Sequence, residues 1–154
     1  MNFSTIFSKN RIYRYTLVRH LSNSKKTVFF LCLNPSTADE VNNDPTVTRC
    51  IGYARDWGFG KLLLGNIFAI RSTDPNLLYN VDNPIGDEND KWIKNMAKYS
   101  DLIIGAWGNH GKLNSRSSQI LNLISNIHCL KKTKLGEPSH PLYLSKKLKP
   151  IPFY

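Results

Sequence analysis

The chain has 154 residues, of which 41% are hydrophobic and 21% charged, so a disordered or collagen-like chain is excluded and one globular domain over residues 1–154 is expected. It carries 21 Lys and Arg against 11 Asp and Glu, a formal net charge of +10. A positive excess of this size favours a polyanionic partner such as nucleic acid.

Sequence features that would indicate a membrane protein, a secreted protein or a metalloprotein are missing. No apolar run approaches the roughly 20 residues that span a bilayer, and the first seven residues lack the build of a signal peptide. Cys32, Cys50 and Cys129 are too far apart in sequence to form a zinc or iron–sulfur motif. We therefore expect a cytoplasmic monomer without cofactor, metal or membrane partner.

Hydrophobic patterning predicts strands that alternate with helices. In chain order we expect an edge strand at Arg11–Arg19, a buried strand at Thr27–Leu33, a helix at Pro45–Trp57, a strand at Lys61–Phe68, a loop at Ile70–Asn83, a helix at Glu88–Tyr99, a strand at Asp101–Trp107, a helix at Ser115–Ile127 and a short strand at His128–Leu130. Asp44 is the predicted N-cap of the first helix, with Pro45 in its first turn. This order is typical of an α/β fold, a three-layer α/β/α sandwich with a central, mainly parallel sheet.

Polar segments follow the predicted buried strands, where open α/β sheets bind their ligands. Asn34-Pro35 follows the first buried strand, Asn66 lies near the end of the second, and His140-Pro141 lies in a late polar loop. Each has a plainer interpretation: Asn34 as a turn residue, Asn66 bonded to loop backbone, and His140 as a surface histidine. Six lysines flank His140, and basic residues also crowd the N-terminal stretch, although both sets are also compatible with an ordinary solvated surface. These basic residues are Lys131, Lys132, Lys134, Lys146, Lys147, Lys149, Arg11, Arg14, Arg19, Lys25 and Lys26.

Most of the chain from Leu33 to about Gly111 resembles a bacterial and phage family of unknown function, domain of unknown function 1643. The matching segments are Leu33–Asp39, Asp44-Pro45-Thr46 with Arg49-Cys50, Gly58-Phe59-Gly60, Asn66–Ala69, Asp74-Pro75, Pro84-Ile85-Gly86 with Asn89-Asp90, and Ala106-Trp107-Gly108 with His110-Gly111. This resemblance by itself implies no activity.

A looser resemblance connects Leu33-Asn34-Pro35-Ser36 and His140-Pro141-Leu142-Tyr143-Leu144-Ser145 to the two active-site motifs of the uracil-DNA glycosylase superfamily. It implies a glycosylase-like fold in which Asn34 positions water, Asn66 reads the base and His140 stabilises the departing base. Leu142 and Tyr143 match the part that enters the minor groove. The first motif lacks the usual preceding Gly and the strongly basic carboxylate, so a modified or damaged pyrimidine is as good a substrate as uracil.

Further site residues are expected from their chemistry and position. Asp39 is the candidate carboxylate that helps Asn34 hold water, and Phe68 is the candidate for stacking on a flipped base. Candidate contacts to DNA phosphates are Ser36, Arg49, Arg71, Ser139, Ser145, Lys146 and Lys147.

The favoured hypothesis is a DNA glycosylase that excises a damaged or modified pyrimidine, such as a modified base of phage DNA, by hydrolysis of the N-glycosidic bond. One alternative is a non-catalytic nucleic-acid-binding module on the same fold. Another is an enzyme that processes nucleotides or nucleosides, with phosphate at Ser36-Thr37 and a metal at Asp39 and Asp44.

Overall fold

The computed structural model describes residues 3–154, which build one seven-stranded sheet with the strand order β1-β2-β4-β3-β5-β6-β7. The strands are β1 (Ile6–Phe7), β2 (Arg14–His20), β3 (Thr27–Cys32), β4 (Lys61–Asn66), β5 (Leu102–Ala106), β6 (Ile127–Cys129) and β7 (Ile151–Pro152). The central strands are continuous apolar runs because both of their faces are covered.

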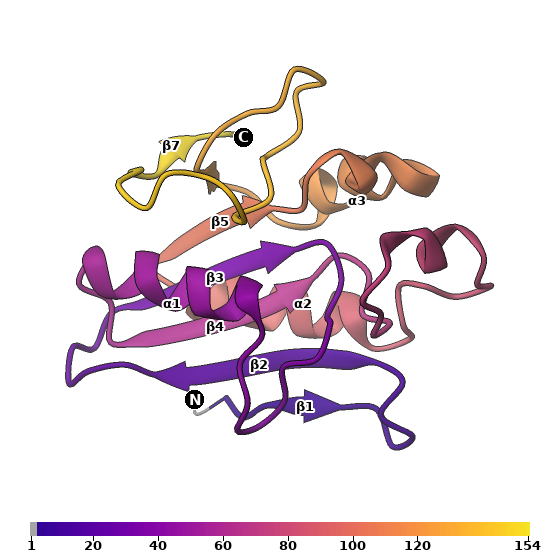
Figure 1. Cartoon of the computed structure of the whole chain (residues 1–154), viewed down its shortest axis with the longest axis horizontal. Coiled ribbons are helices and arrows are strands. Elements are labelled where there is room, and N and C mark those ends of the chain that lie inside the picture. The colour runs from indigo at the N-terminus through magenta and orange to yellow at the C-terminus, as the bar shows by residue number, and fades with distance from the viewer. Residues whose placement is uncertain (1–2) are drawn as a thin grey trace.

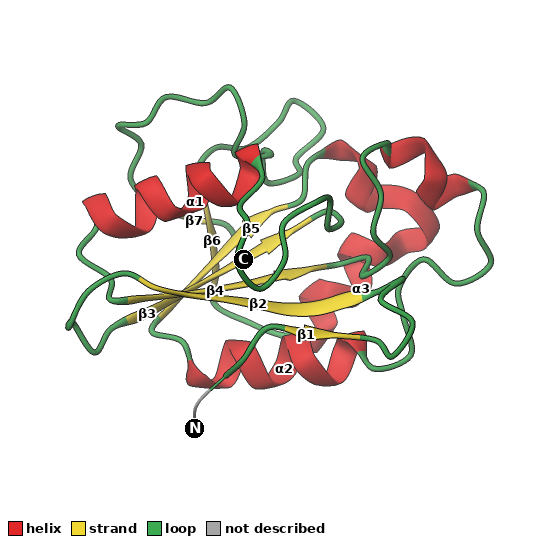
Figure 2. Ribbon diagram, turned by 60° about the horizontal axis from the view of Figure 1, so that its bottom comes forward, coloured by secondary structure: helices red, strands yellow, loops and turns green. Residues whose placement is uncertain are grey.

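Three α-helices cover the sheet, which makes the fold three-layered (Figures 1 and 2). The helices are α1 (Pro45–Asp56), α2 (Asn89–Tyr99) and α3 (Arg116–Leu123). Alternate residues of β3 divide between two cores: Phe29 packs with the buried side of α2 and α3, whereas Phe30 packs with that of α1. The predicted cap is confirmed, because the Asp44 side chain accepts the Val47 N–H at the start of α1.

The sheet is mixed, which corrects the expectation of a mainly parallel one. The pairs β3–β4, β3–β5 and β5–β6 are parallel, whereas β1–β2, β2–β4 and β6–β7 are antiparallel. The alternation of strands and helices therefore predicts only the central, parallel part of the sheet, which consists of β4, β3, β5 and β6. β2 is also not the edge strand, since β1 pairs on its outer side.

Other differences concern the ends of elements. β4 stops at Asn66, because the Ile67 and Phe68 amides both donate to the same neighbouring segment, to the carbonyls of Cys32 and Leu33, whereas consecutive amides of a strand point to opposite sides. The last helix ends at Leu123, and the expected loop after β4 contains a short 3-10 helix, Pro75–Tyr79. Within residues 3–154 no helix has both the length and the apolar character needed to span a membrane.

The topology creates a crevice between the carboxyl ends of β3 and β5. These strands are neighbours, but β3 leads into α1 on one face and β5 leads towards α3 on the other. Their following loops therefore diverge, and such a divergence is where open α/β sheets bind ligands.

Candidate functional site

A pocket of about 590 Å³ occupies this crevice. Its walls come from the segments that follow β3, β4 and β5, from the start of α1, and from residues 139–149, which we call the C-terminal strap. Asn34, Asp44 and His140 all line it, although they lie far apart in sequence. Two of the three residues predicted to be catalytic, Asn34 and His140, are thus brought together.

The Asn34 side chain is held in one orientation by backbone carbonyls. Its Nδ2 donates to the carbonyl of Ser72 at 3.0 Å and to that of Pro35 at 3.1 Å. Both acceptors require the amide nitrogen, so Oδ1 is the remaining polar atom, and no donor within residues 3–154 is hydrogen-bonded to it. An amide oxygen on a half-buried pocket wall can accept a hydrogen bond from water.

The His140 ring is held by its own turn. The Leu142 N–H donates to Nδ1 at 3.3 Å, so the neutral ring carries its proton on Nε2. Burial lowers the pKa of His140, and the nearby Asp44 carboxylate opposes this shift only in part. A neutral imidazole that donates through Nε2 is therefore the favoured state of this pocket wall at neutral pH.

The carboxylate of the pocket is Asp44 and not Asp39. Asp44 is 6% exposed, and its two oxygens accept the N–H groups of Val47 at 2.9 Å and Ala38 at 3.3 Å. Asp39 is absent from the pocket wall, and its carboxylate accepts two amides of the following turn, from Val41 and Asn42. These amides lower the pKa of Asp39 to about 2. Asp39 therefore shapes the loop and does not help Asn34 to hold water.

The two residues predicted to bind the base do not line the pocket. Phe68 is fully buried in the core shared with α2 and α3, which leaves no face of its ring for stacking on a base. Asn66 is 1% exposed, and its Nδ2 has no partner among residues 3–154. Its backbone carbonyl accepts from the Asn89 side chain at 2.8 Å. A role for Asn66 in reading a base therefore remains a prediction.

Two arginines of β2, the buried Arg14 and the half-buried Arg19, hold the β3–α1 loop, residues 33–44. Arg14, which is 2% exposed, donates to the carbonyl of Ala38 at 3.0 Å, and burial lowers its pKa to about 10. Arg19 donates to the carbonyls of Asp39 at 2.7 Å and Asn42 at 3.0 Å. These guanidinium groups stabilise the loop that carries Asn34.

A third arginine holds the same loop from the surface. Arg11, just before β2, forms a two-point ion pair with Glu40 at 2.8 and 2.9 Å. Two of the residues predicted to form a basic surface, Arg11 and Arg19, thus make hydrogen bonds within the chain. A third, Arg14, is buried.

The strap is held by one face of α1. Arg49 Nη1 donates to the carbonyl of Leu144 at 2.6 Å, and Tyr53 Oη donates to that of Ser145 at 2.7 Å. One turn further on, Trp57 Nε1 donates to the carbonyl of Leu148 at 3.2 Å. The spacing of four residues aligns these donors along α1, and the strap that they hold carries His140.

The remaining candidates for phosphate contacts fall into two groups. Ser36 lines the pocket, and Lys146 and Lys147 are exposed on the strap. Arg71 lies with its guanidinium 4.9 Å from the centre of the Phe7 ring and donates to the carbonyl of Arg11, so part of it is engaged within the chain.

The two serines of the His-Pro segment make contacts within the chain. The Ser139 amide donates to the carbonyl of Lys131 at 2.8 Å, and Ser145 Oγ accepts the Lys147 amide at 3.2 Å. Their hydroxyls as phosphate ligands therefore stay a prediction.

Comparison with known proteins gives one match. The family model described as "Protein of unknown function (DUF1643)" matches residues 14–142, which include the pocket and the first part of the strap. The chain belongs to this family. Neither the curated proteins nor the solved structures include one that matches the chain.

Two further wall residues, Trp107 and His110, come from the segment that follows β5. Trp107, 1% exposed, borders the pocket, and its Nε1 donates to Glu137 Oε2 at 2.5 Å. His110 also lines the pocket and is hydrogen-bonded through Nδ1 to the Tyr79 hydroxyl at 2.9 Å. The Trp107–His110 segment directly follows β5, and that position at the carboxyl end of a buried strand is the sequence signal that points to it. Within the described residues 3–154, no group of three or more His, Cys, Asp or Glu side chains could hold a metal ion.

Proposed function

We propose that the protein is a DNA glycosylase with a glycosylase-like fold, which hydrolyses the N-glycosidic bond of a damaged or modified pyrimidine. The observation that carries the proposal is the convergence of Asn34 and His140 on one pocket at the carboxyl ends of β3 and β5. A side chain that can orient water and a neutral donor then face one ligand, which is what this hydrolysis needs.

In the proposed reaction the bond between C1′ and the base nitrogen breaks early, and its electron pair leaves with the base. His140 Nε2–H donates to the base oxygen that gains negative charge. Water held by Asn34 Oδ1 adds to C1′, and its proton ends on the released base. The Asp44 carboxylate on the pocket wall stabilises the cation-like sugar, a role that differs from the water-holding role expected of Asp39.

A modified pyrimidine is preferred over uracil because Asp44, the one carboxylate among residues 3–154 that lines the pocket, has both oxygens engaged with backbone amides, which leaves Asn34 to hold the water. An amide oxygen can orient water but cannot remove its proton. A base that leaves readily requires less activation of the water than an ordinary pyrimidine does. Modified bases of phage DNA and oxidised or deaminated pyrimidines are therefore the first substrates to test.

The test is base release from duplex and single-stranded DNA that carries uracil, oxidised pyrimidines, or hydroxymethylated or glucosylated cytosine. The native chain is expected to form abasic sites on one of these, with a loss of about 10²–10³-fold in Asn34→Ala and in His140→Ala. Matched controls are Asn122→Ala on the outside of α3 and His20→Ala at the end of β2, both exposed positions. Equal rates in all four variants, with folding checked by circular dichroism, would overturn the roles of Asn34 and His140.

The second candidate is a non-catalytic nucleic-acid-binding module, favoured by the exposed strap lysines and by a pocket wall whose one carboxylate among the described residues, Asp44, already accepts two backbone amides. It predicts DNA binding without release of any base, and DNA affinity that is unchanged in Asn34→Ala and His140→Ala. The same assays thus separate the two functions.

A further inference from the structure

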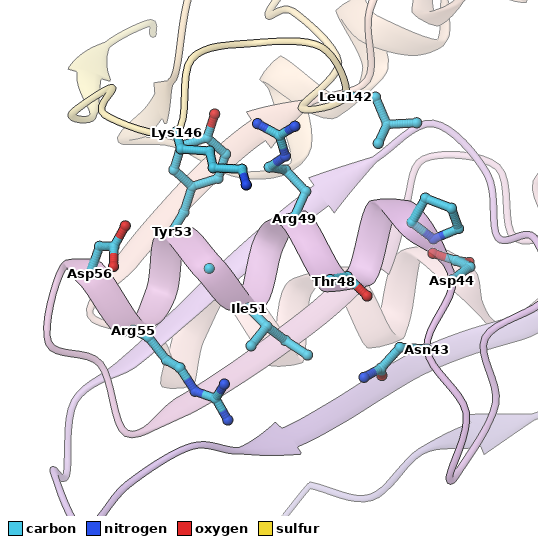
Figure 3. Close-up of a pocket in the computed structure, with 12 residues that line it drawn as sticks. Asn43, Asp44, Thr48, Arg49, Ile51, Tyr53, Arg55, Asp56, Leu142 and Lys146 are labelled. Carbon is cyan, nitrogen blue, oxygen red and sulfur yellow. The ribbon is translucent and has the colours of Figure 1, made fainter.

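A second cavity, of about 740 Å³, runs along the outer side of α1 and is bordered by the strap (Figure 3). Asp44, Pro45 and Leu142 line both this groove and the pocket of Asn34 and His140. The two spaces therefore adjoin at the start of α1, and one extended ligand can occupy both.

The groove passes over Gly52, in the middle of α1. Glycine is among the poorest helix formers, so at such a position a packing reason is expected. A Cβ added to Gly52 would meet no atom within 4 Å, whereas one added to Gly60 would collide with the Ser24 backbone and one on Gly111 with the Trp107 ring. Packing within the chain thus explains Gly60 and Gly111 but not Gly52. A bare backbone at this position allows close approach by a partner.

The charged lining of the groove suits an anion. Arg49 and Arg55 of α1 and Lys146 of the strap border it. Arg49 uses one nitrogen to hold the carbonyl of Leu144, whereas Arg55 has no side-chain hydrogen bond or ion pair among residues 3–154. Of the two acids in the lining, Asp44 accepts backbone amides and is buried, which leaves Asp56 as the exposed carboxylate.

We propose that this groove binds the phosphodiester backbone of the DNA strand whose base enters the adjoining pocket. The inference rests on the proposed function for the identity of the ligand. Arg55 follows Arg49 by six helical positions, about 9 Å along the axis, which corresponds to roughly two to three nucleotides at 3.4 Å per step. The groove therefore grips a short stretch of strand beside the target nucleotide, with the sugar–phosphate chain lying across Gly52.

The experiment measures binding of a fluorescently labelled oligonucleotide, single-stranded and duplex, by anisotropy at several salt concentrations. Gly52→Leu fills the groove while it improves helix propensity, so folding is retained. It is expected to weaken binding about tenfold. Arg55→Gln is expected to reduce the slope of log affinity against log salt by about 0.7–0.9, because one phosphate contact is lost. Controls are Ser118→Leu on α3 and Lys25→Gln in the β2–β3 turn, both exposed.

Native affinity and native salt slope in both groove variants would overturn the inference, as would the absence of DNA binding by the native chain. Base release is scored separately on the same proteins. Release that depends on Asn34 and His140, with full binding by Gly52→Leu, would leave the glycosylase standing without this groove. Weakened binding by the groove variants, with no base released by the native chain, would leave the groove standing without the glycosylase.

Discussion

The two candidate residues Asn34 and His140 lie on segments that are held by different kinds of contact. The β3–α1 loop is held by guanidinium groups from Arg11, Arg14 and Arg19, of which Arg14 is buried. The strap is held by α1 side chains, each through a single hydrogen bond to a carbonyl. The loop is therefore anchored by charged groups, one of them buried, whereas the strap depends on three single hydrogen bonds and on the packing of Leu144 and Leu148 against the core.

The two regions also differ in how much of their positive charge is exposed. The arginines near β2 make internal contacts, and their positive charge is partly offset by Glu40 and Asp44. The strap lysines Lys146 and Lys147 are exposed. Part of the formal charge of +10 is therefore offset within the chain, and the strap lysines contribute exposed positive charge beside α1.

The largest expected effect is on the loop. Arg14→Leu leaves the buried Asp44 carboxylate without its nearby cation and the Ala38 carbonyl without its donor. We expect the free energy of unfolding to fall by about 3 kcal/mol, measured by urea denaturation. Lys147→Leu on the strap should change it by no more than about 0.5 kcal/mol. A small change in Arg14→Leu would mean that the loop is held without this guanidinium.

A smaller effect is expected where the strap is held. Tyr53→Phe removes the hydroxyl that donates to the Ser145 carbonyl, a loss of about 1 kcal/mol at most because the remaining contacts persist. Trypsin cleaves after lysine, so Lys146 and Lys147 report directly on opening of the strap. We expect cleavage there to accelerate severalfold under native conditions.

The control for this prediction is Tyr99→Phe, which alters an exposed tyrosine on α2. It should leave tryptic cleavage of the strap unchanged. Equal cleavage rates in Tyr53→Phe and the native chain would show that the Tyr53 hydroxyl does not hold the strap.

Sequence reasoning predicted the parts of this site that depend on order along the chain. The central strands and the Asp44 cap follow from strand–helix alternation and capping rules, and the meeting of Asn34 with a late histidine follows from the rule about carboxyl ends. It did not find β7, because Ile151–Pro152 is a two-residue strand that contains proline.

Partners of side chains were the least predictable feature. Arg14 looks in sequence like any surface arginine, and only the paths of two segments place it beneath Ala38. Phe68 was expected near a base because it lies close to a strand end. The chain turns after Asn66, however, and buries the Phe68 ring in the core. Such outcomes depend on loop paths, which local patterning does not encode.

The smallest and most selective effect is expected on the stability of the strap as the pH is lowered. Burial lowers the pKa of His140, so the folded chain binds this proton less readily than the unfolded chain does. Stability is therefore complete above the ordinary histidine pKa of about 6.5 and falls as pH drops from there towards the lower folded value. Asp44 and His110 share the pocket wall with His140, and the Asp44 carboxylate alone opposes the shift.

The β3–α1 loop should respond only at much lower pH. Its Asp39 and Glu40 carboxylates have pKa values lowered to about 2, by backbone amides and by Arg11 respectively. Their stabilising contacts are lost only as pH falls from about 4 towards 2. At pH 5 the strap amides should therefore lose protection against hydrogen exchange, relative to the intrinsic rate at that pH, while the loop amides do not. Histidine NMR titration, with His140→Gln to assign the signal, checks the cause, and a His140 pKa at or above 6.5 would contradict it.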